Sequence, residues 1–258
     1  MDRADLVSII VPTLNEADNV RPLVEQILES RAEPLEIIFV DDGSIDGTCE
    51  RIRQIAVDHP VRLIEREEAA FGLSGAVIAG AKYARGDRLV VMDADLSHPP
   101  ARIPDLLRAL NSQDVDLVIG SRYVSGGSTP GWPLWRKFMS RVAAALAFPL
   151  TGVHDAMCGF FATRRDLLLE LASGSNGFKI VFEMMIRGGG RLRAVEVPIL
   201  FRDRARGSSK MSFGVALVFF FRWLVAIGTV ITRERLWKQS TCDGELARRR
   251  HEFAVTRQ

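Results

Sequence analysis

The chain has 258 residues, 47% of them hydrophobic and 26% charged, and carries a formal net charge of +2. This length suits one large α/β domain or one domain with a small appendage, and a charge so close to zero argues against a nucleic-acid-binding protein. Cys49, Cys158 and Cys242 lie far apart with no C-x-x-C pair, which argues against a disulfide framework or a zinc site and favours a reducing compartment.

The first 120 residues alternate short apolar runs with segments of helical pattern. Helices are expected at about 18–30, 46–58, 73–85 and 101–111. This alternation predicts an α/β fold with a mostly parallel central sheet, helices on both faces, and ligands at the carboxyl ends of the strands. The expected strands are continuously apolar rather than alternating, as buried strands are: Val7–Val11, Ile37–Val40, Val61–Ile64, Leu89–Met92 and Leu117–Gly120.

The pattern changes after Tyr123. A glycine-rich stretch at 125–131 precedes an amphipathic helix that is expected around Trp132–Phe148 and carries Arg136. Three more elements are expected: a helix after Thr163, a helix over Phe178–Arg187 and a strand over Arg193–Phe201.

A long apolar window lies near the C-terminus, at Phe213–Ile231. Twelve of its nineteen residues are Leu, Ile, Val or Phe, and Arg222 is its one charged residue. It is long enough to span a bilayer, but basic residues flank it on both sides, which favours a helix in the membrane interface over a spanning helix or a buried core helix. The expected segments are a domain at 1–210, a membrane-associated helix at 211–235 and a polar, disordered tail at 236–258. No signal peptide is expected at the N-terminus.

Two carboxylates, Asp93 and Asp95, follow the strand Leu89–Met92. Residues two apart in a strand point to the same side, so both can face one divalent cation, Mg²⁺ or Mn²⁺, that neutralises a nucleotide diphosphate. In the alternative interpretation, Asp95 caps the next helix and Asp93 is a solvated turn residue. Polar clusters at 12–16, 41–44 and 120–122 also follow strands, which favours the metal site because all of them meet on one rim.

The clusters on this rim suit a nucleotide-binding site that does not use a glycine-rich phosphate loop. Neither G-x-G-x-x-G nor G-x-x-x-x-G-K-S/T is present, so the diphosphate must be bound by a metal and basic side chains. Asp41 or Asp42 is expected to bind a ribose or base, whereas Ser44 and Asp46 are expected to cap a helix. The basic side chains available for phosphates are Arg122, Arg136 and the basic loop at 202–210, which would alternatively attract anionic lipid.

Three runs, at 8–16, 40–48 and 91–100, resemble family 2 glycosyltransferases, which have a nucleotide-sugar-binding fold of the GT-A type. Further runs resemble the polyprenol (dolichol) monophosphate mannose synthases within that family, and the similarity extends from about residue 6 to 212. These runs are Gly120–Tyr123, Gly159–Phe161, Gly177–Lys179 and Arg204–Lys210.

The resemblance implies transfer of mannose from GDP-mannose to a polyprenyl phosphate with inversion, at the cytoplasmic side of a membrane, by a peripheral or monotopic protein. It implies catalytic roles for Asp95, Arg122, Arg136, Arg204 and Lys210, with Asp93 and Asp95 on the metal and Arg122 and Arg136 near the acceptor phosphate. The residues implied to bind the nucleotide sugar are Pro12, Leu14, Glu16, Val40, Asp42, Asp93, Ala94, Asp95, Ser97, Arg122, Arg204 and Lys210.

Two positions depart from the family pattern. Leu14 stands where the family commonly has Tyr, and Ser97 stands where relatives often have Gln beside the metal. The nucleotide and the third protein ligand therefore stay open, and His98 is expected to be structural. The alternatives are a UDP-sugar-dependent polyprenyl-phosphate glucosyl- or aminosugar transferase, a membrane-bound scaffold with a degenerate site, and a nucleotidyltransferase, which would not explain an apolar helix next to the basic loop.

Overall fold

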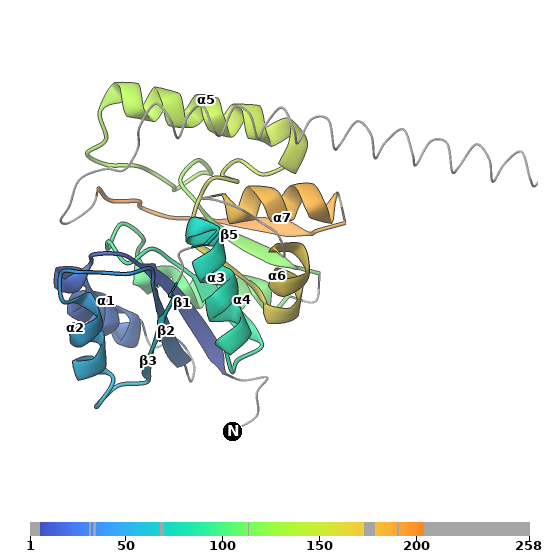
Figure 1. Ribbon diagram of the computed structural model, residues 1–258. Coiled ribbons are helices and arrows are strands. Elements are labelled where there is room, and N and C mark those ends of the chain that lie inside the picture. The colour runs from blue at the N-terminus through green and yellow to red at the C-terminus, as the bar shows by residue number, and fades with distance from the viewer. Residues whose placement is uncertain are drawn as a thin grey trace, which may run out of the picture. The chain divides into compact units, whose positions relative to one another are not determined.

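The computed structural model describes residues 6–30, 32, 35–67, 70–112, 114–172, 179–189 and 191–203 (Figure 1). The expected helix at 211–235 and the tail at 236–258 lie outside these residues. In the part of the chain that is described, no helix combines the length and the apolar character needed to cross a membrane.

Seven strands form a single sheet in the order β3-β2-β1-β4-β6-β5-β7. All strand pairs are parallel except the two that involve β6, which runs antiparallel to β4 and β5. The five strands expected in the first 120 residues are confirmed within about a residue or two at their ends. The bounds are β1 (Val7–Thr13), β2 (Leu35–Asp41), β3 (Val61–Glu65), β4 (Arg88–Val91), β5 (Leu117–Ser121), β6 (Phe161–Arg164) and β7 (Ala194–Pro198).

The sheet is covered on both faces. Ile9 and Ile10 are neighbours in β1 and are both fully buried, although adjacent strand residues point to opposite faces. On one face Gly80 of α3 (Gly72–Tyr83) brings its backbone so close to Ile10 and Val40 that an added Cβ would clash with Ile10. The expectation of helices on both faces of a mostly parallel sheet is therefore confirmed.

The helices pack in two groups. In the first group, α1 contacts both α2 and η1, and η1 also contacts α4. In the second group, α3, α6, α7 and α5 form a chain in which each helix contacts the next. In Figure 1, α5 runs along the top of the molecule above α7. The bounds are α1 (Ala17–Glu29), α2 (Thr48–Ile55), α3 (Gly72–Tyr83), η1 (Pro100–Arg102), α4 (Ile103–Leu110), α5 (Leu134–Thr151), α6 (Arg165–Ala172) and α7 (Ile180–Gly188).

Two helices differ from expectation at their ends. α2 begins only at Thr48 because Gly47, at φ 89°, holds a left-handed conformation that does not continue a helix. α5 begins after Pro133 and continues to Thr151, where Gly152 ends it in a left-handed conformation. α5 is therefore shifted toward the C-terminus relative to the expected helix, with nearly the same length.

The order of the strands creates a switch point. The chain runs from β1 outward through β2 to β3, and then returns to place β4 on the other side of β1. Loops leaving the carboxyl ends of β1 and β4 therefore diverge, and in open α/β sheets ligands bind in the crevice at such a point. The candidate residues at 12–16 and 93–97 follow these two strands.

Candidate functional site

The loops after β1 and β2 are joined by hydrogen bonds into one surface, here called the nucleotide rim (residues 14–17 and 42–48). The backbone N–H of Asn15 donates to Ser44 Oγ (2.8 Å), and Asn15 Oδ1 accepts from the N–H of Ile45 (3.0 Å). Asn15 adopts φ 58°, a left-handed conformation that asparagine tolerates better than most residues other than glycine. Asp46 accepts the N–H groups of Ala17 and Thr48, but the N-cap of α2 is Gly47, so the expectation that Ser44 and Asp46 cap this helix is wrong.

The two neighbouring acids of β2 have different surroundings. Asp41 is buried, and its Oδ1 accepts the N–H groups of Gly43 and Ser44, which shapes the turn. Asp42 lies at the rim and pairs with Arg66 (2.8 Å). Burial raises the pKa of Asp42 and the charge of Arg66 opposes this, with a net upward direction. Asp42 is therefore the member of the pair that a nucleotide would reach.

The other predicted nucleotide contacts divide between rim and core. Leu14 is 37% exposed and Glu16 is partly exposed, and both belong to the rim. Pro12 and Val40 are strand residues with buried side chains. Their placement supports the rim from beneath, whereas Leu14, Glu16 and Asp42 present surface to a ligand.

Asp93 and Asp95 follow β4, with Asp95 and Ala94 buried and the side chain of Asp93 36% exposed. Asp95 Oδ1 accepts the N–H of Ser97 (3.0 Å) across Leu96, whose φ is 62°. The alternative in which Asp95 caps the next helix is wrong, because η1 has Pro99 at its N-cap. The two carboxylates are therefore held by their own turn and not by a helix.

His98 supports this turn from within the core. It is fully buried, stacks on Phe160 and meets the edge of Phe201. Its Nδ1 accepts the backbone N–H of Asp93 (3.1 Å), so Nδ1 carries a lone pair, and burial lowers the pKa of the ring. The 3.8 Å approach of Nδ1 to Asp93 Oδ2 is thus no ion pair, and His98 leaves the negative charge of Asp93 uncompensated.

The donor set around this turn fits a hard divalent cation. It consists of two carboxylates and the hydroxyl of Ser97, which is buried without a hydrogen-bond partner among the described residues. No group of three or more His, Cys, Asp and Glu side chains that could hold a metal occurs in the described residues. A cation here would take its remaining ligands from phosphate oxygens and water, as Mg²⁺ commonly does.

Arg122 follows β5 and forms a buried ion pair with Asp155. Its Nε and Nη2 donate to the two oxygens of Asp155 (2.8 and 2.7 Å), and its backbone N–H donates to Oδ2 (2.9 Å). Burial lowers the pKa of Arg122, but Asp155 outweighs this and raises it overall. The guanidinium also lies 5.2–5.6 Å from the ring centroids of Tyr123, Trp132 and Phe201. Two nitrogens of the Arg122 guanidinium already donate to Asp155. The predicted contact of Arg122 with phosphate therefore depends on its remaining N–H groups.

Arg136 reaches the same region from α5. Its guanidinium lies 3.9 Å from the centroid of Trp132 and pairs with Asp203 (2.9 Å), and its buried Nε has no partner among the described residues. The backbone N–H of Arg202 donates to the carbonyl of Ser97 (3.1 Å), which ties the start of the basic loop to the acidic turn. Arg204 and Lys210 lie outside the described residues.

Three polar residues near the site were not predicted. Asp155 holds Arg122, and Glu196 of β7 accepts the N–H groups of His154 and Asp155 (2.8 and 3.0 Å). Lys179 donates to the carbonyl of Met157 (3.3 Å), and burial, together with Arg122, lowers its pKa. No motif surrounds Asp155 or Glu196. The one signal for Asp155 is that it is the single acidic residue in the apolar run 153–161.

Known proteins match this chain in sequence. Residues 8–172 match the model of glycosyl transferase family 2. A dolichol-phosphate mannosyltransferase of Pyrococcus furiosus is 43% identical over 80% of this chain, which spans 59% of that protein's length. The protein of the same name from Saccharomyces cerevisiae is 37% identical, covering 82% of this chain and 83% of the relative. An undecaprenyl-phosphate mannosyltransferase of Micrococcus luteus is 38% identical, covering 89% and 98%.

Solved structures match the fold. The glucosyl-3-phosphoglycerate synthase of Mycobacterium tuberculosis, solved with Mn²⁺, UDP and glucosyl-3-phosphoglycerate, aligns with a TM-score of 0.64 at 21% identity and covers 89% of this chain and 80% of its own. The same enzyme solved with Mg²⁺ and UDP aligns with a TM-score of 0.63. The GT-A type fold expected from the sequence is thereby confirmed, and the match over residues 8–172 shows that the chain belongs to glycosyl transferase family 2.

Proposed function

We propose that this glycosyltransferase moves mannose from GDP-mannose to a polyprenyl phosphate and inverts the anomeric carbon. The observation that carries the proposal is the acidic turn with Asp93 and Asp95 at the switch point of the sheet, in a chain 37–43% identical to proteins named dolichol-phosphate mannosyltransferase. Arg122 and Arg136, which pair with Asp155 and Asp203 in this structure, are the proposed cationic partners of the acceptor phosphate.

The donor is proposed to lie across the nucleotide rim. Leu14, Glu16 and Asp42 would contact the nucleoside, supported by Pro12 and Val40. Asp93, Ala94 and Asp95 would hold the diphosphate through Mg²⁺ or Mn²⁺, with the unpartnered hydroxyl of Ser97 beside it. When bound, the cation would neutralise the diphosphate that leaves. The predicted partners on the donor phosphates from the basic loop are Arg204 and Lys210.

The acceptor phosphate is proposed to approach past Arg122 and Arg136. One of its oxygens forms the bond to the anomeric carbon as the bond from that carbon to the donor phosphate breaks, and GDP leaves on the opposite face. A phosphate monoester is anionic near neutral pH, with a second pKa of about 6, so no strong general base is required. Positioning of both phosphates would then account for most of the rate.

Membrane association is proposed because α5 exposes apolar side chains. The outward residues include Leu134, Trp135 and Phe138, which are 83%, 64% and 67% exposed. α5 also carries three basic residues and no acidic one, a composition suited to an anionic membrane surface. The protein would lie at the cytoplasmic side of a membrane as a peripheral or monotopic protein.

The test is transfer of radiolabelled mannose from GDP-mannose into an organic-extractable lipid that mild acid cleaves. We expect full-length protein to form this product with Mg²⁺ or Mn²⁺ and to lose at least a hundredfold in kcat/KM in Asp95→Asn. Asp58→Asn, which changes an exposed turn residue, is the matched control and should retain full activity. Turnover of UDP-glucose or a UDP-aminosugar without turnover of GDP-mannose would refute this proposal. It would support a polyprenyl-phosphate glucosyl- or aminosugar transferase that uses a UDP-sugar.

A further inference from the structure

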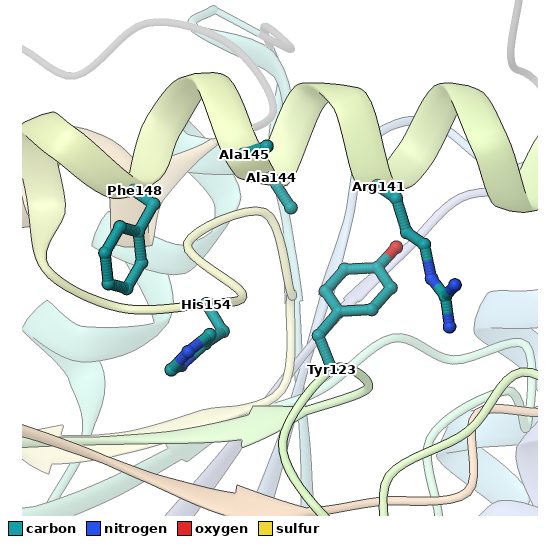
Figure 2. A pocket seen from close by; sticks show the side chains of 6 residues that line it. All are labelled: Tyr123, Arg141, Ala144, Ala145, Phe148 and His154. Carbon is teal, nitrogen blue, oxygen red and sulfur yellow. The ribbon is translucent and has the colours of Figure 1, made fainter.

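A hollow of about 400 Å³ lies beneath α5, between this helix and two loops. Its volume falls in the range of about 300–1,000 Å³ that is usual for small-molecule sites. Figure 2 shows Tyr123 and Arg141 at one end and Phe148 and His154 at the other, below the stretch of α5 that carries the two alanines. The lining residues are Tyr123, Arg141, Ala144, Ala145, Phe148 and His154.

The lining is chiefly apolar, with a cation at one end. Between Arg141 and Phe148 the helix advances seven residues, or about 10 Å, and presents the small side chains of Ala144 and Ala145. Arg141 is exposed and has no ion pair within the described residues. No acidic side chain lines the hollow, so an anionic amphiphile with an apolar chain complements it better than a sugar nucleotide does.

Each of the two loops below α5 is tied to a neighbouring element by a polar contact. The hydroxyl of Tyr123 donates to Ser140 Oγ (2.6 Å) and fixes one loop to the helix. His154 Nδ1 lies 2.8 Å from Glu196 Oε2, and the ring packs 5.0 Å from that of Phe148. These contacts favour a hollow that is largely preformed, and a preformed site loses less entropy on binding.

The hollow adjoins the arginine that the proposed reaction uses. Tyr123 directly follows Arg122, and His154 directly precedes Asp155, so the buried pair Arg122–Asp155 joins the two loops that bound the hollow. A phosphate beside Arg122 would thus lie next to this chiefly apolar hollow. Before the stretch that lines the hollow, α5 exposes Leu134, Trp135 and Phe138, the apolar side chains that are proposed to meet the membrane.

We infer that this hollow is a binding subsite for the isoprenyl segment next to the phosphate of the acceptor lipid. The inference rests on the proposed function and adds where the chain of the lipid is recognised. Ala144 and Ala145 provide the space, Tyr123 and Phe148 line it, and Arg141 stands at its end. A larger side chain at position 145 would fill the space without touching the nucleotide rim.

The test is binding of a ten-carbon prenyl phosphate to the full-length protein in detergent, without a sugar donor. We expect Ala145→Leu to weaken binding at least tenfold, while Ala143→Leu, the same change on α5 outside the hollow, leaves it within twofold. Inorganic phosphate, used as a competitor, should bind both variants equally because it has no chain. Equal affinity of Ala145→Leu and the unaltered protein for the prenyl phosphate would overturn the inference.

Kinetics separate this inference from the proposed function. With GDP-mannose and a polyprenyl phosphate, Ala145→Leu should raise the KM for the acceptor at least tenfold and leave the KM for GDP-mannose unchanged. Prenyl phosphate binding that depends on residue 145 in a protein without mannosyl transfer would refute the proposed function and support the subsite. Mannosyl transfer with an unchanged acceptor KM in Ala145→Leu would support the function and refute the subsite.

Discussion

Arg122 and Asp155 make the most completely buried ion pair among the described residues, with side chains 8% and 0% exposed. Removing one partner from a buried pair leaves an uncompensated charge and costs about 3–5 kcal/mol. We therefore expect Asp155→Asn to lower the free energy of unfolding by about this amount, as measured by urea denaturation.

The chain offers a matched control for this prediction. Asp114 pairs with Arg193 at the surface, where the side chains are 84% and 53% exposed, and such pairs contribute about 0–1 kcal/mol. Asp114→Asn should thus change the free energy of unfolding by less than 1 kcal/mol. Equal losses in the two variants would show that burial does not set the energy of the Arg122–Asp155 pair.

His98 illustrates how a core residue can act on a site through another residue. Its Nδ1 accepts the N–H of Asp93, and residues that orient metal ligands typically change metal affinity by about 10–100-fold. We expect His98→Phe, which keeps an aromatic ring in the core but removes this acceptor, to weaken Mn²⁺ binding at least tenfold, measured by electron paramagnetic resonance. Unchanged Mn²⁺ affinity in a folded His98→Phe protein would contradict this role.

At the scale of elements, Glu36 of β2 ties the sheet together at the end opposite the site. Its Oε1 accepts from the hydroxyl of Ser8 (2.7 Å) and the N–H of Arg85 (2.6 Å), and its Oε2 pairs with Arg62 (3.0 Å). Ser8 Oγ in turn accepts the N–H of Gly86 (3.0 Å). One carboxylate therefore links β1, β2, β3 and the turn before β4.

This network predicts a pH dependence of stability. Burial raises the pKa of Glu36, but the hydrogen bonds from Arg85 and Ser8 and the pair with Arg62 outweigh burial and lower it. Its stabilisation is therefore complete above the ordinary glutamate pKa, about 4.3, and is lost as the pH falls through the lower folded-state value. Glu36→Gln should cost about 2 kcal/mol at pH 7 and less at pH 3, measured by denaturant titration.

The exposed residue Glu25, which lies 4.0 Å from Arg21 on α1, supplies the control for Glu36. Glu25→Gln should alter the free energy of unfolding by less than 1 kcal/mol at both pH values. A Glu36→Gln protein that loses equal stability at pH 3 and pH 7 would show that the carboxylate charge is not the source of the stabilisation.

Elements with a local signature were predictable from the sequence, whereas β6, which lacks one, was not. β1 and β2 are rich in Val and Ile, and a helix was expected after each of them. β6 has only four residues and takes its strand conformation by pairing antiparallel with β4 and β5, more than 40 residues away. The site divides in the same way, because Asp93 and Asp95 follow a recognisable strand whereas Asp155 is recruited by the long-range contact with Arg122.

At the scale of the whole described fold, the site joins two regions of different chemistry. The strands β1, β2 and β4 deliver acidic and polar loops to the nucleotide rim and the acidic turn. The segments after β5 deliver Arg122, Arg136 and the apolar surface of α5. In the proposed reaction, a water-soluble donor and a lipid acceptor would therefore reach the same reacting carbon from different sides.

The exposed apolar surface of α5 leads to a prediction about membrane binding. Trp135 and Phe138 are 64% and 67% exposed, and burial of each in the membrane interface would remove apolar area worth about 25 cal/mol per Å². We expect Trp135→Ser/Phe138→Ser to reduce co-flotation with anionic vesicles at least fivefold while leaving transfer to a ten-carbon prenyl phosphate within twofold. Tyr83→Ser, at a 59% exposed aromatic on α3, is the matched control and should float like the unaltered protein. Equal flotation of the unaltered protein and both variants would mean that α5 contributes nothing to membrane binding. If Tyr83→Ser reduced flotation as much as the α5 variant does, the loss of flotation would not be specific to this helix.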